Sequence, residues 1–106
     1  MIHTYKLDKD GRPTPEPDLL AWARWMGETD RMLAVAHVGE AEVSTAFIGI
    51  DMSIGIDMSG GRRKPPLVFE TMVFGGLHDG EAMRTATHAA ALKAHELTVA
   101  RLKAGL

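Results

Sequence analysis

Runs of β-favouring side chains in the middle of the chain predict β-strands. Residues 32–38 and 41–51 are rich in β-favouring side chains, and the Gly39-Glu40 turn between them favours a hairpin. Residues 66–74 repeat the same character. In the second run, one predicted face carries Val43, Thr45, Phe47 and Gly49 and the other carries Ser44, Ala46, Ile48 and Ile50.

Neither face of these predicted strands is clearly polar. A sheet with one face on helices and the other in water should alternate more cleanly between apolar and polar residues. We therefore expect the second face to be covered in part, and in so small a chain the cover we expect is another subunit. The N-terminal residues 2–7 predict a short edge strand, and the prolines of residues 13–17 predict an extended connector.

Two helices are predicted, one short and one long. Asp18 is the expected N-cap of the first helix, whose apolar stripe consists of Leu19, Trp22, Ala23 and Met26. The second helix is predicted from about Asp79 to Lys103, with acidic residues at its start and basic residues at its end. Its expected stripe consists of Thr85, His88, Leu92, His95, Val99 and Leu102.

These elements predict a single α+β domain over residues 1–106. The predicted order is β-α-β-β-β-α, in which a small antiparallel sheet packs against one short and one long helix. With 106 residues and no cysteine, the chain has no disulfide framework and no thiolate metal site. Two domains of about half that length would lack an adequate core.

Charge and hydropathy exclude several function classes. The net charge of −2 gives no basic surplus for binding duplex nucleic acid. No apolar stretch approaches the roughly 20 residues that span a bilayer, and residues 1–8 lack the pattern of a signal peptide. We expect a cytoplasmic protein that binds neither a membrane nor duplex nucleic acid.

The segment 51–65 is the first candidate for ligand binding. It holds serines, paired glycines and three consecutive cations, Arg62, Arg63 and Lys64. Backbone amides near glycine and a cluster of cations suit a phosphate group, although short basic clusters are also common on solvated loops. If these cations hold phosphate, replacing all three by alanine should cost several kcal/mol of binding free energy.

Acidic and imidazole side chains supply the other candidates. Glu70 lies mid-strand between apolar residues, so it is expected to be paired, with Arg84 or His95 as partner, or to line a pocket. Asp51 is the second acid of interest. His88 and His95 are seven residues apart, about 10 Å along a helix, which is too far for a shared metal. We expect such imidazoles to pack at the edge of the core and to bond to a strand.

Three segments together resemble a family of short uncharacterised proteins of bacteriophages and prophages. They are residues 18–25, 43–51 and 67–76, and the similarity extends through Arg84 to His95. Met52 departs from the family pattern, as do Thr85 and His88. Small phage proteins often act against host defences, so the resemblance implies a counter-defence role.

The function predicted is sequestration of a nucleotide-type immune signal by a non-catalytic homo-oligomer without cofactor or metal. The ligand would be a cyclic nucleotide or an ADP-ribose derivative, and an aromatic ring would stack on its base. An inhibitor that masks a host defence protein, as anti-CRISPR proteins do, is the alternative, and a small nucleotide hydrolase using Glu70 and His95 is a third hypothesis. The predicted ligand-binding residues are Arg62, Arg63, Lys64, Asp51, Glu70, Arg84, His88, His95 and Trp25.

Overall fold

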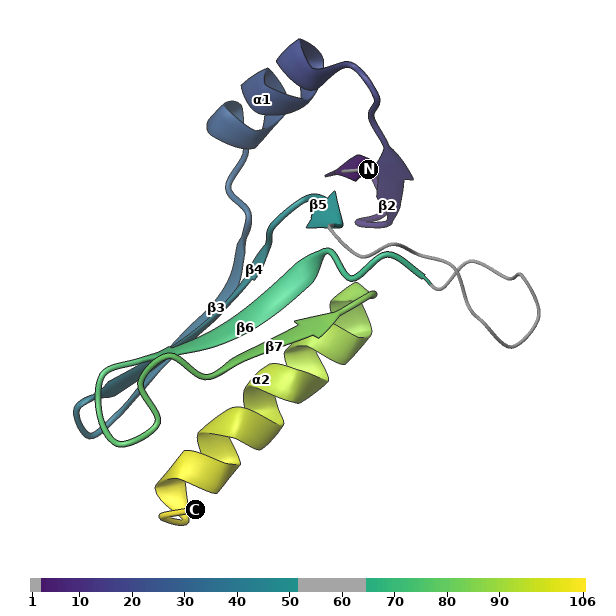
Figure 1. Cartoon of the computed structure of the whole chain (residues 1–106). Coiled ribbons are helices and arrows are strands. Elements are labelled where there is room, and N and C mark those ends of the chain that lie inside the picture. Colours follow the sequence, from purple (N-terminus) through teal and green to yellow (C-terminus); the bar gives the residue numbers. More distant parts are fainter. Residues whose placement is uncertain (1–2, 52–64) are drawn as a thin grey trace.

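The computed structural model describes residues 3–51 and 65–106, which form two helices and two antiparallel sheets (Figure 1). The predicted α+β class, with one short and one long helix, is confirmed. The single predicted sheet is instead two sheets, of orders β2-β1-β5 and β3-β4-β6-β7. The elements are β1 (His3–Leu7), β2 (Pro13–Pro15), α1 (Leu19–Glu28), β3 (Met32–Val38), β4 (Ala41–Phe47), β5 (Ile50–Asp51), β6 (Phe69–Phe74), β7 (Ala82–Thr85) and α2 (His88–Lys103).

The four-stranded sheet has one face covered by α2 and one face that it leaves open. The predicted alternation is confirmed in β4, where Val43, Thr45 and Phe47 are fully buried while the residues between them are only partly buried. In β6, Phe69, Thr71 and Val73 are buried in the same way. The opposite side, called here the open face, carries Met32, Val35, His37, Glu42, Ser44, Ala46, Glu70, Met72, Phe74, Ala82 and Arg84.

The long helix begins at His88, nine residues later than predicted. Residues 82–85 instead form β7, whose backbone pairs with β6, and this tertiary pairing outweighs their helical propensity. The side chain of Thr87 caps the helix by accepting a hydrogen bond from the Ala90 amide at 3.0 Å. The predicted acidic start of the helix is therefore wrong, whereas Arg101 and Lys103 lie in its last turn as expected.

The buried face of α2 also differs from the predicted stripe. Its fully covered residues are Ala91, Ala94, His95 and Thr98. Only His95 was predicted among them, and Val99 and Leu102 pack against a neighbouring cluster of Ala41, Val43 and Val73. Small side chains on this face let the helix axis approach the sheet closely, so the buried polar groups of helix and sheet can meet.

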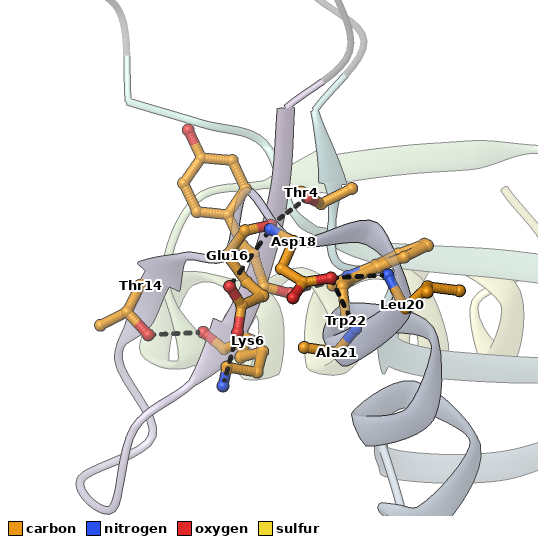
Figure 2. Close-up of polar contacts among 9 residues, drawn as sticks. Thr4, Lys6, Thr14, Glu16, Asp18, Leu20, Ala21 and Trp22 are labelled. Carbon is orange, nitrogen blue, oxygen red and sulfur yellow. Dashed lines mark hydrogen bonds and ion pairs between the residues drawn. The ribbon is translucent and has the colours of Figure 1, made fainter.

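Hydrogen bonds hold the N-terminal strands and α1 together (Figure 2). Asp18 caps α1 as predicted, accepting from the amides of Leu20 and Ala21 at 3.0 and 3.1 Å. The indole Nε1 of Trp22 donates to the carbonyl of Tyr5 at 3.0 Å, which fixes α1 on β1. The proline-rich segment predicted as a connector contributes β2, which pairs with β1 over Pro13–Pro15.

One apolar cluster joins these parts. Phe47, Val68, Phe69 and Ala91 are fully buried, and partly buried side chains from β1, α1 and β3 pack around them. The rings of Trp25 and Phe47 meet edge-on, with centroids 5.7 Å apart, and Phe47 meets Phe69 at 5.3 Å. Trp25, a residue predicted to bind ligand, thus packs in the apolar cluster.

Candidate functional site

The residues predicted from the sequence to bind ligand do not gather into one site. Arg62, Arg63 and Lys64 lie outside the described residues. The other six come from five places: the open face, the helix-covered face, the start of α2, the apolar cluster and β5. Trp25 is in the apolar cluster, and Asp51 is buried in β5, in register with His3 of β1.

Glu70 and Arg84 form an ion pair on the open face. They are register partners on β6 and β7, and Arg84 Nε donates to Glu70 Oε2 at 3.2 Å. This pairing was one of two predicted for Glu70. The other, with His95, is wrong, because Glu70 projects away from the face on which His95 packs. The Glu70–Arg84 pair lies on the face of the sheet opposite the helix, so it does not line a pocket between sheet and helix.

The two imidazoles of α2 occupy different surroundings. His88 is exposed at the start of the helix, with its ring edge-on to Phe69 at a centroid distance of 6.4 Å. His95 is buried, and its Nδ1 lies 2.9 Å from Thr45 Oγ1 on β4. The expectation of an imidazole at the core edge bonded to a strand is therefore confirmed for His95.

A buried polar network links the helix to two strands. Thr45 Oγ1 lies 2.7 Å from Thr71 Oγ1 as well as within hydrogen-bonding distance of His95 Nδ1. Since a hydroxyl has one proton to donate and two lone pairs, Thr45 donates to at most one of these partners and accepts from at least one. Thr98 satisfies its own hydroxyl by donating to the Ala94 carbonyl at 2.8 Å. Buried polar side chains are thus paired throughout this layer.

Burial lowers the pKa of His95 below its usual value of 6.5, and the nearby Glu96 carboxylate opposes this only in part. Above about pH 6.5 the imidazole is neutral in both the folded and the unfolded chain. As the pH falls below this, the unfolded chain takes up a proton that the folded chain does not, so the free energy of unfolding should fall.

This pH dependence is measured by urea denaturation at about pH 7 and about pH 5.5, comparing the wild type with His95→Gln. The variant should show a smaller loss of stability, because glutamine does not titrate and its amide can still bond Thr45. An identical loss of stability between the two pH values in the wild type and His95→Gln would contradict this assignment.

A cavity of about 370 Å³ lies between α2 and the β6–β7 strands. Apolar and polar side chains share its lining, which consists of Thr71, Val73, Glu81, Ala82, Met83, Thr98 and Arg101. Arg101 donates to Glu81 Oε2 at 2.6 Å and to the Leu106 carbonyl at 3.1 Å. Hydrogen bonding and charge from Arg101 lower the pKa of Glu81, and His78 contributes in the same direction.

Only weak signals in the sequence point to this cavity. In the sequence, Arg101 stands out only as a charge at the end of the predicted helix, and Thr71 only as one member of a predicted strand. Thr98 and Arg101 are three residues apart and share a helix face, which is visible in the sequence. That β7 would turn back to form the opposite wall was not visible, because these residues were expected to be helical.

Comparisons with known proteins add no functional information. No family model matches the chain, and no curated protein or solved structure matches it significantly. Within residues 3–51 and 65–106, no helix is both long and apolar enough to cross a membrane. The same residues contain no group of three or more histidine, aspartate or glutamate side chains placed to hold a metal ion.

Proposed function

We propose that this chain is a non-catalytic binding protein that holds a small nucleotide-type anion in the cavity between α2 and β7. The observation that carries the proposal is the mixed lining of that cavity, with a guanidinium at Arg101, hydroxyls at Thr71 and Thr98, and apolar walls at Val73 and Met83. Small-molecule sites are typically of about this size and combine apolar walls with a few polar groups.

The chemistry of the lining favours phosphate or another anionic group at Arg101. A guanidinium binds such groups through two parallel hydrogen bonds. In the structure this position is taken by the Glu81 carboxylate, which is held ionised by the same guanidinium. A ligand anion would displace Glu81 from Arg101, while the ribose or base would meet the hydroxyl and apolar side chains.

The biological setting of the proposal comes from the resemblance to phage and prophage proteins. In that setting the ligand is an immune signal such as a cyclic nucleotide or ADP-ribose derivative, and the protein sequesters it as a homo-oligomer in the host cytoplasm. Turnover is not part of the proposal. The hydrolase hypothesis required Glu70 beside His95, and these side chains project from opposite faces of the sheet.

Two variants of the cavity test the proposal by shifting the affinity in opposite directions. Isothermal titration with ADP-ribose, cyclic AMP and a cyclic dinucleotide is expected to identify binding of at least one probe. Arg101→Gln should then weaken that binding about tenfold or more, since it removes a charge-assisted contact. Glu81→Gln should strengthen it, because the variant removes a competing carboxylate and frees Arg101.

Matched controls on α1 are Arg24→Gln and Glu28→Gln, both exposed and far from the cavity lining. They make the same chemical changes and should leave affinity unaltered. The released ligand should be unchanged in mass after denaturation of the complex. Absence of binding for all three probes, a chemically altered product, or equal effects of Glu81→Gln and Arg101→Gln would contradict the proposal.

The alternative function, masking a host defence protein, is favoured by a different observation. The open face exposes about half of the side chains of Met32, Val35 and Phe74, and exposed apolar patches are typical of protein contact sites. This function requires that face to be free in the working protein. A dimer that buries the open face would therefore exclude it, and the oligomeric state in solution tests this.

A further inference from the structure

The open face of the four-stranded sheet exposes several large apolar side chains to water. Met32, Val35 and Phe74 have exposed fractions of 49%, 48% and 46%. Antiparallel sheets with one solvated face normally present polar side chains there. The edge strand β3, Met32–Val38, contains no lysine, arginine, aspartate or glutamate along its whole length, although such charges commonly protect edge strands from association. This face is therefore suited to burial against protein.

Large and small side chains alternate across the middle of the open face. The strand register places Val35, Ser44, Met72 and Ala82 in one row across β3, β4, β6 and β7. The row reads large, small, large, small. Reversed end to end, it reads small, large, small, large, so each large side chain meets a small one.

We propose that the open face packs against the same face of a second copy, about a two-fold axis parallel to the strands and passing between β4 and β6. This symmetry places Ser44 of each copy opposite Met72 of the other, and Val35 opposite Ala82. Face-to-face sheets pack with nearly aligned strands about 10 Å apart, which suits this axis. An interface with two-fold symmetry must be complementary to itself, and the central row meets that requirement.

Charge on the open face is compatible with this arrangement. The ionised side chains of the neighbouring row are Glu70 and Arg84, which already neutralise each other within one chain. The two-fold axis places Arg84 opposite Met32 and Glu70 opposite Ala46, so no charge meets its like. On the other side of the central row lie His37, Glu42 and Phe74. There the axis places Glu42 opposite Phe74, and His37 of the same chain lies 3.8 Å from Glu42. The apolar central row thus lies between two rows that hold the charged and titratable side chains of this face.

The proposal concerns assembly and does not depend on the ligand proposed for the α2–β7 cavity. Its first test introduces a carboxylate at the centre of the interface with Ser44→Asp. Sedimentation equilibrium should show a dimer for the wild type and a dissociation constant raised about hundredfold or more for the variant, because the interface would bury an unpaired charge. Ala89→Asp, on the exposed side of α2, adds the same charge elsewhere and should remain dimeric.

A size exchange tests the specific pairing of residues 44 and 72. Ser44→Met places two large side chains opposite each other and should weaken the dimer about tenfold. The double variant Ser44→Met/Met72→Ser exchanges large and small positions and should restore the dissociation constant to within about threefold of the wild type. Circular dichroism of each variant confirms that the monomer fold is retained.

Each outcome decides the proposal. A dimer that is weakened by Ser44→Asp, unaffected by Ala89→Asp and restored by the exchange supports it. A wild-type monomer at high micromolar concentration overturns it and leaves the open face to a different protein. A dimer insensitive to Ser44→Asp also overturns it, because association would then use another surface. A dimer that the exchange fails to restore refutes the proposed axis.

Discussion

Replacing Phe47 by alanine is expected to lower the free energy of unfolding by about 3–5 kcal/mol, the largest effect of any single substitution proposed for this chain. Phe47 is fully buried at the end of β4, and its ring contacts Trp25 of α1 and Phe69 of β6 edge-on. The substitution removes these contacts and leaves a cavity where the two sheets and α1 meet. For a domain of this size, such a loss is a large part of the total stability.

Urea denaturation followed by circular dichroism measures this effect. Leu77→Ala is the control, because Leu77 is 93% exposed and its truncation removes almost no buried surface. It should change stability by less than about 0.5 kcal/mol. A loss below about 1 kcal/mol for Phe47→Ala would mean that the apolar cluster does not join the two sheets as described.

Thr45→Val is expected to cost about 1–3 kcal/mol although it preserves the size of the side chain. The hydroxyl of Thr45 is the shared partner of Thr71 Oγ1 and His95 Nδ1, at 2.7 and 2.9 Å. Valine fills the same space but leaves both partners buried without this bond. The cost is therefore the desolvation of two polar groups rather than a loss of packing.

A combined variant separates these causes. Thr45→Val/Thr71→Val/His95→Leu removes the whole network and should be more stable than Thr45→Val alone, because it leaves no orphaned polar group in the layer. The same denaturation assay measures both proteins. If the losses of stability at the three positions simply add up in the combined variant, the network is not coupled, in conflict with the geometry at Thr45.

The strands and the first helix could be predicted because local signals and tertiary packing agree there. The alternation around Val43, Thr45 and Phe47 matches the face that α2 covers, and Asp18 caps α1 as its position suggested. The error at residues 82–85 has the opposite cause. Ala82, Met83 and Arg84 favour a helix locally, but pairing with β6 places them in a strand.

The candidate cavity was less predictable than the strands because its walls come from distant parts of the chain. His95 could be assigned to the core edge from its helical spacing, but its partner Thr45 lies fifty positions earlier. Arg101 and Glu81 meet only because β7 turns back along α2. The complementarity of the open face likewise requires the strand register, since Ser44 and Met72 become neighbours only when β4 pairs with β6.

Native mass spectrometry of the protein purified from cells with active nucleotide-signalling defences tests ligand binding and assembly together. It reports the number of subunits and any retained small molecule in one spectrum. We expect a dimer carrying a nucleotide-sized ligand that is released with its mass unchanged. A monomer without such a ligand, which also fails to bind the added nucleotide probes, would contradict this expectation.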